Sequence, residues 1–184
     1  MAKVRNNIII QGLSGSLGEQ LVIKQDKAGR TIVGVAPSFD PNRTYTEAQT
    51  EQHEKFRDAS IYAKGAKGEE IYVEKAEGTP MNPYNVAMAD WFHAPEVTEI
   101  DAEAWSGQAG QMIRIQAVDN VQVTQVNVVI TDAENAVVEQ GAALRAEGAW
   151  WAYTTTASVA GEVMKIVVTA RDLPGNIASL SWES

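Results

Sequence analysis

Residues 163–182 read VMKIVVT-ARDLPGN-IASLSW, two alternating apolar runs around a cluster of turn residues. Pro174 presets φ for a tight turn, and Gly175 and Asn176 tolerate positive φ. The flanking runs carry β-branched residues at alternate positions, which is the period of a half-buried strand. The stretch therefore predicts a β-hairpin close to the end of the chain.

The first strand of this hairpin closes with Ala170-x-Asp172-x-x-Gly175-Asn176. This ending resembles the final hairpin of bacterial immunoglobulin-like domains. The resemblance implies an immunoglobulin-like β-sandwich and carries no information about a ligand.

Other short strands are predicted upstream at about ten-residue spacing, which is typical of a sandwich. The alternation slips near Gln125, which indicates a bulge. The chain contains no cysteine, so the inter-sheet disulfide of antibody-type domains is missing. The predicted strands cover residues 112–118, 121–131, 136–140 and 150–156.

Length and charge both favour two modules, residues 1–95 and 96–184. The first carries 11 basic against 12 acidic residues and the second 4 against 12, so the acidity is concentrated in the second. An acidic module cannot neutralise phosphates, so we expect no nucleic-acid binding. No apolar run is long enough to span a bilayer or to form a secretory signal, so we expect no membrane span and synthesis in the cytoplasm.

The N-terminal module combines strands with helices, so the whole chain is predicted to be mainly β with a helical part (α+β). Thr46-Glu-Ala-Gln49 is a capping box that begins a helix running to about Lys64, stopped by Gly65. Pro83 begins another helix, and Pro95 lies beyond its end. The predicted strands cover residues 8–11, 20–25 and 30–35, and the predicted helices 46–64, 69–76 and 83–92.

The pattern from Gly12-Leu-Ser-Gly15-Ser-Leu-Gly18 through Tyr84-Asn-Val-Ala-Met-Ala-Asp90-Trp-Phe92 resembles uncharacterised bacterial proteins with a two-part layout. The resemblance implies a β-rich and helical head before an immunoglobulin-like tail. It transfers no catalytic residue.

Few residues point to chemistry, and we expect no enzymatic activity and no cofactor. The loop that contains Gly12, Gly15 and Gly18, here called the glycine loop, lacks Gly-Lys-Ser/Thr and leads into a strand, so a turn is favoured over a phosphate site. His53 and His93 are the only histidines and are expected at the surface. A calcium site is the alternative to a structural role, in which Asp and Asn end strands by bonding their own backbone. Its ligands would come from one end of the sandwich, namely Asp119, Asn120, Asp172 and Asn176.

Trp150 and Trp151 are adjacent in a predicted strand, so the pleat sends them to opposite faces and only one can enter the core. The other is available to the N-terminal module, to a second copy of the chain or to a sugar ring. We expect Trp151 to be the residue at an interface.

These observations favour a non-enzymatic structural protein that self-associates or docks onto a particle, filament or appendage. The continuous run Ile8-Ile9-Ile10 supports this hypothesis, because it suits burial on both faces and the short meander around it is too small to supply that cover. The expected partners are other copies of the chain or another protein. The alternative is an adhesive module that binds carbohydrate or protein through Trp151 and the loops at one end of the sandwich.

Overall fold

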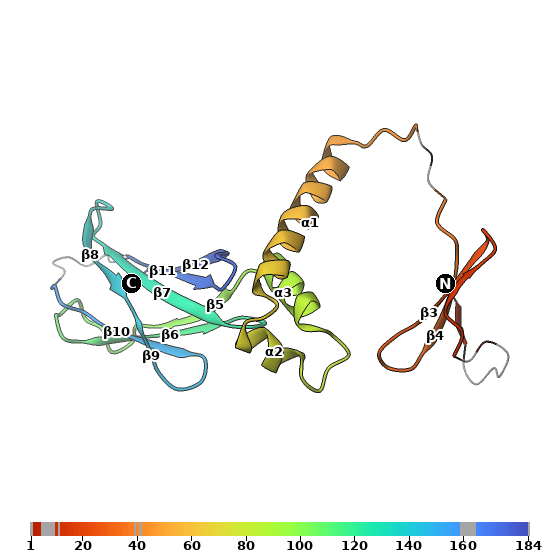
Figure 1. Ribbon diagram of the computed structural model, residues 1–184. Helices are drawn as coiled ribbons and strands as arrows, with labels where there is room; N and C mark the ends of the chain where they lie inside the picture. The colour runs from red at the N-terminus through yellow and green to blue at the C-terminus, as the bar shows by residue number, and fades with distance from the viewer. Residues whose placement is uncertain are drawn as a thin grey trace.

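The computed structural model describes residues 2–4, 10, 12–38, 40, 42–158 and 165–183. Among them, strands form three four-stranded sheets, and the helices follow the first sheet in the chain (Figure 1). The fold is mainly β with a helical part, as predicted. Its elements are β1 (Ala2–Val4), β2 (Gly15–Leu17), β3 (Leu21–Gln25), β4 (Thr31–Val35), α1 (Glu47–Ala66), α2 (Glu70–Ala76), α3 (Pro83–Phe92), β5 (Glu96–Asp101), β6 (Met112–Val118), β7 (Val123–Thr131), β8 (Val137–Ala142), β9 (Leu144–Arg145), β10 (Trp150–Thr154), β11 (Lys165–Asp172) and β12 (Ile177–Glu183).

The N-terminal sheet has the strand order β1-β4-β3-β2, and all its pairs are antiparallel. Strands β3 and β4 match the second and third predicted strands, while β1 and β2 were not predicted. The expected strand over residues 8–11 falls almost wholly outside the described residues. Ile10, the described member, lies in a turn where its carbonyl accepts the N–H of Leu13 at 3.3 Å.

The helices begin where their capping residues predict. The Thr46 hydroxyl accepts the backbone N–H of Gln49 at 3.3 Å, and the Gln49 side chain accepts the N–H of Thr46 at 3.1 Å. Helix α1 ends at Ala66 rather than at Lys64, because one glycine costs a helix only about 1 kcal/mol and the next turn buries Ala66. Helices α2 and α3 match their predicted ranges to within a residue.

The last eight strands form two antiparallel sheets that enclose one hydrophobic core, which we call the two-sheet domain. One sheet has the order β5-β6-β10-β9 and the other β12-β11-β7-β8. Strands β6, β7 and β11 alternate buried apolar residues with more exposed ones, because each has one face toward the opposite sheet. Fully buried residues at the centre of the core are Ile113, Ile115, Val126, Val128, Ile130, Ile166 and Val168.

Two register shifts explain where alternation in the sequence is interrupted. The pairing of β7 with β11 steps from Gln125 to Val123, so Thr124 is the extra residue and the slip predicted near Gln125 is confirmed. Strand β5 was missed by sequence analysis. Its buried residues, Val97 and Ile100, are three positions apart because a second shift lies between Val97 and Glu99.

The predicted hairpin joins β11 to β12. One Asp172 carboxylate oxygen accepts the backbone N–H groups of Gly175 at 2.8 Å and Asn176 at 2.6 Å, and Gly175 has a φ of +98°. The strand runs three residues beyond the predicted Thr169. The Asp-x-x-Gly-Asn pattern therefore supplies the carboxylate and the backbone N–H groups that hold the turn together.

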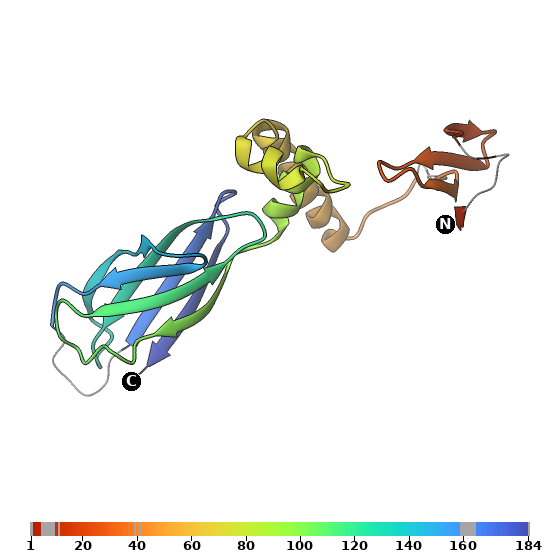
Figure 2. The ribbon, with the colours of Figure 1, turned by 90° about the horizontal axis from the view of Figure 1, so that it is seen from below.

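Helices α2 and α3 pack against one end of the two-sheet domain, whereas the N-terminal sheet lies apart from both (Figure 2). Val121 and Leu173, from the β6–β7 and β11–β12 connections, join the apolar cluster of the helices around Tyr72 and Val86. The Asn176 amide also donates to the carbonyls at the C-terminal end of α3, those of Asp90 (3.4 Å), Trp91 (3.2 Å) and His93 (3.4 Å). No helix within the described residues is long and apolar enough to cross a membrane.

Candidate functional site

The N-terminal sheet buries little of its apolar surface. Of its described side chains only Ile23 and Thr31 are buried, at 6% exposure each. The Gln25 amide on the Ile23 face donates to the carbonyl of Leu13 at 3.1 Å, so the preceding loop contributes to covering that face. Large apolar residues remain exposed elsewhere on the sheet, namely Leu17 (62%), Leu21 (37%) and Val35 (82%).

The opposite face of this sheet holds a shallow, mostly apolar hollow of about 300 Å³. Val22 pairs with Gly34, and Lys24 pairs with Ile32, so these residues lie side by side on one face. The hollow continues to Val35, the last residue of β4, and to Pro37 beyond it. The structure therefore presents an apolar surface and two three-residue edge strands, β1 and β2.

The isoleucine run is only partly described. Ile8 and Ile9 lie outside the described residues, so their role at an interface stays a prediction. Ile10 is half-buried in its turn beside the sheet.

Trp150 and Trp151 point to opposite faces of β10, as the pleat predicts. Trp151, which we expected at an interface, is the one that enters the core. Trp151 is 6% exposed and belongs to the core, with the Arg145 guanidinium 5.7 Å from its ring centroid. Trp150 takes the outer face, where the Arg114 guanidinium lies 4.5 Å from its ring centroid. The expectation that Trp151 faces a partner is thus corrected: its side chain completes the core.

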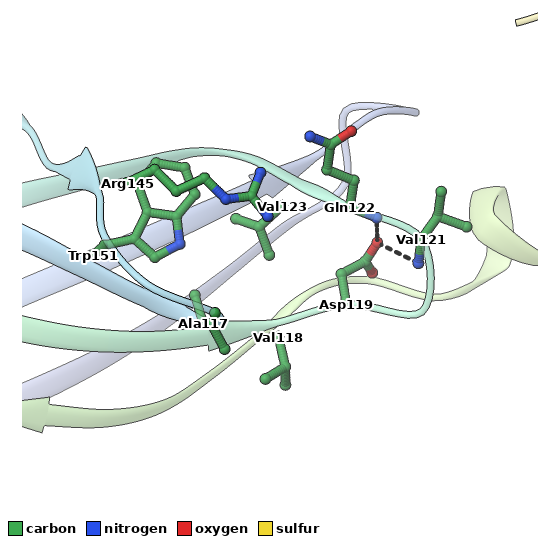
Figure 3. Close-up of a pocket in the computed structure, with 10 residues that line it drawn as sticks. Ala117, Val118, Asp119, Val121, Gln122, Val123, Arg145 and Trp151 are labelled. Carbon is green, nitrogen blue, oxygen red and sulfur yellow. Dashed lines mark hydrogen bonds between the residues drawn. The ribbon is translucent and has the colours of Figure 1, made fainter. Parts of the chain in front are cut away.

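A second hollow, of about 180 Å³, lies at the end of the two-sheet domain beside Trp151 (Figure 3). Arg145 and Gln122 line it together with Asp119. One Asp119 oxygen accepts the backbone N–H groups of Val121 at 3.0 Å and Gln122 at 2.7 Å, as the dashed lines show. This carboxylate therefore shapes the β6–β7 turn.

Three of the four calcium candidates, Asp119, Asp172 and Asn176, gather where α3 meets the two-sheet domain, and each of the two aspartates uses one carboxylate oxygen to accept the N–H groups of its own turn. Asp172 accepts the two N–H groups of its turn and the Asn176 amide at 2.7 Å. Asn120 is exposed, and its carbonyl is 3.5 Å from the Lys75 ammonium. Within the described residues, no group of three or more acidic or histidine side chains is arranged to hold a metal ion.

The same junction contains a buried polar chain that sequence analysis missed. The Tyr72 hydroxyl donates to Asp90 at 2.6 Å, and the Tyr62 hydroxyl is 2.6 Å from that of Tyr72. Asp90 is fully buried, and burial raises its pKa to about 6, while the Tyr72 hydrogen bond opposes the rise and the Asp119 and Asp172 carboxylates add to it. The sequence signal that could have indicated this chain is Asp90, a charged residue on the apolar face of α3.

The histidines and the glycine loop take structural roles. His53 stacks edge-on against Tyr45, with ring centroids 4.6 Å apart, and His93 Nδ1 is 2.6 Å from the Ala89 carbonyl. Gly12, Gly15 and Gly18 all have positive φ, as turns around β2 require.

Comparison with protein-family models and with curated proteins finds no match. Among solved structures, CopC from Methylosinus trichosporium OB3b is 13% identical, with a TM-score of 0.37 over 48% of this chain and 89% of CopC. An engineered protein is 14% identical, with a TM-score of 0.35 over 55% of this chain and 26% of its own. A conjugate transposon protein from Bacteroides vulgatus is 14% identical, with a TM-score of 0.27 over 50% of this chain and 82% of its own.

Proposed function

We propose that this chain is a non-enzymatic structural protein whose N-terminal sheet joins it to other copies in a larger assembly. The observation that carries the proposal is the uncovered sheet: four strands leave Leu17, Leu21 and Val35 exposed, while only two described side chains are buried. A small sheet is stable when a second layer covers it, and exposed strand edges pair readily with other chains. A second copy of the chain would cover the exposed face of the N-terminal sheet and would pair with its edge strand.

We further propose that the two-sheet domain is immunoglobulin-like and is displayed by the assembly. Its strand order supports this assignment. If β5 to β12 are lettered A, B, C, C′, D, E, F and G, the sheets become A-B-E-D and G-F-C-C′. Immunoglobulin sandwiches place A-B-E-D opposite a sheet containing C, F and G.

The adhesive alternative has less support. Trp151 is in the core, and Arg114 lies over the ring of the outward Trp150, where a sugar would have to stack. An adhesive module would remain monomeric and bind ligand through the two-sheet domain.

The decisive experiment compares the wild type with Val35→Lys by size exclusion coupled to light scattering over a concentration series, followed by negative-stain imaging. Val35 is 82% exposed, so the substitution should change the stability of the monomer by no more than about 0.5 kcal/mol. At an interface it would bury an unpaired ammonium, which should weaken association by roughly tenfold or more.

Leu144→Lys is the matched control, since Leu144 is 76% exposed on β9 of the two-sheet domain. We expect it to assemble like the wild type. A wild-type chain that stays monomeric at high concentration would rule out self-association, and equal behaviour of the two variants would place the interface elsewhere.

A further inference from the structure

Two carboxylates, Asp90 and Asp119, lie where α3 packs on the two-sheet domain, and each has one buried oxygen without a hydrogen-bond donor among the described residues. Asp90 accepts the Tyr72 hydroxyl on Oδ2, whereas its Oδ1 is unpartnered. Asp119 uses Oδ2 for the N–H groups of Val121 and Gln122, whereas its Oδ1 is buried and unpartnered. Asp119 accepts the N–H of Val121, which packs in the same cluster as Tyr72, and the Asp119 carboxylate is among the causes that raise the pKa of Asp90, so the two carboxylates share one site.

Two ionised carboxylates this close in a buried site repel each other, and each unpartnered oxygen has lost its hydration. A single proton between the two Oδ1 atoms removes both costs, since it cancels one charge and makes one acid a donor to the other. We propose that Asp90 and Asp119 share one proton, and that this proton helps hold α2 and α3 on the end of the two-sheet domain.

The other groups facing the pair support this assignment. Tyr72 of α2 and Tyr62 of α1 are hydroxyl groups whose pKa is raised by burial, so they remain neutral donors. Asp172 of β11 adds a negative charge and disfavours ionisation of Asp90. Neither Asp90 nor Asp119 forms a salt bridge among the described residues, and Lys75 on α2 lies against the Asn120 carbonyl.

The direction of the pH dependence follows from the pKa of Asp90. Burial raises the pKa of Asp90 to about 6 from the ordinary value of 3.8, so the docked state binds the proton more tightly than a state with the helices released. Docking is therefore strongest below about pH 4, weakens as the pH rises toward 6 and levels off above it. One linked proton limits the change to about tenfold per pH unit.

The primary test is a carbon-13 carboxyl titration of the full chain by NMR, which observes the proton directly. We expect the Asp90 signal to shift with a midpoint near pH 6. A midpoint for Asp90 below about pH 4.5 would overturn the proposal. So would a calcium-dependent shift of the Asp90 signal, because it would identify a cation in place of the proton.

Hydrogen exchange of the α2 and α3 amides, corrected for intrinsic rates, reports the docking itself. In the wild type, protection should fall several-fold between pH 4 and pH 6.5. Asp119→Asn supplies a permanent amide donor to Asp90 Oδ1 while its carbonyl oxygen can still accept the turn N–H groups, so protection should remain and lose this pH dependence.

Glu99→Gln is the control, because it removes an exposed carboxylate of β5 and should leave the profile unchanged. Asp90→Asn provides a second variant with the same expectation as Asp119→Asn if the latter fails to fold. Retention of the wild-type pH dependence in a folded pair variant would overturn the proposal.

Discussion

At the scale of single residues, Glu139 is a buried carboxylate whose hydrogen bonds are satisfied. It accepts the Tyr153 hydroxyl at 2.7 Å, the N–H and hydroxyl of Thr156 at 2.7 and 3.0 Å, and the N–H of Ala157 at 3.0 Å. Burial opposes its ionisation, but these donors outweigh burial and hold the pKa of Glu139 below its usual range. The carboxylate thereby ties β8 to the end of β10.

We predict that Glu139→Gln lowers the free energy of unfolding by about 1–3 kcal/mol at pH 7, because an amide nitrogen brings a donor against N–H groups. Because the pKa of Glu139 is lowered in the folded state, its contribution to stability is present above the ordinary glutamate pKa. That contribution is lost as the pH falls through the pKa of Glu139 in the folded chain. Urea unfolding at several pH values should show that the difference in free energy of unfolding between wild type and variant becomes smaller in acid. Glu134→Gln, in an exposed turn, is the control, and an equal loss there would refute the assigned role.

Gly141 on β8 packs against the ring of Tyr153 at the same place. A Cβ atom at this position would lie 2.9 Å from Tyr153 Cε2. We predict that Gly141→Ala lowers stability by about 1–3 kcal/mol, because the ring is held in the core and by Glu139. Thermal or urea unfolding measures the loss. In a Tyr153→Leu background the cost should shrink, and an unchanged cost would show that the ring is not the cause.

At the scale of elements, the sequence predicts best where a local signal acts alone. Thr46 and Pro83 locate helix starts because capping needs only neighbouring residues. The alternation in β6 and β7 identifies strands because one core covers one face of each. Even the bulge at Thr124 is visible as two polar residues between buried valines.

Long-range pairing accounts for what sequence analysis missed. Strand β5 is interrupted by a register shift, so its two core residues do not alternate. The choice between Trp150 and Trp151 depends on which face of β10 meets the opposite sheet. Asp119, which we propose shares a proton with Asp90, lies on a turn 29 positions along the chain, and no local pattern connects the two.

Gly65 gives a prediction about an element on its own. It lies inside α1 with open space where a Cβ would be placed, and its φ is not positive. Gly65→Ala should therefore stabilise the chain by roughly 0.5–1 kcal/mol through helix propensity. A rise in the urea midpoint without a change in slope would support this prediction. A loss of stability would mean that this part of α1 is not helical in solution.

At the scale of the whole molecule, the two parts on either side of the predicted boundary near Pro95 are in contact. Helices α2 and α3 cover Val121 and Leu173 at the end of the two-sheet domain, and Asn176 bonds the last turn of α3. Within the part of the chain that the structure describes, no helix covers the N-terminal sheet in this way. These contacts predict different effects of removing residues 1–46 and residues 1–95.

We predict that residues 96–184 fold alone, with a single cooperative unfolding transition and strand-type circular dichroism, but with a lower urea midpoint than residues 47–184. The longer fragment keeps Val121 buried and Leu173 half-buried, and an aliphatic side chain contributes about 1.5–3 kcal/mol when fully covered. Residues 47–184 should match the full chain at concentrations where the latter is monomeric, because the N-terminal sheet does not share the helices' core. Equal midpoints for the two fragments would show that the helices do not stabilise the two-sheet domain. An unfolded 96–184 fragment would instead make helices and sheets one folding unit, with the true boundary between β4 and α1.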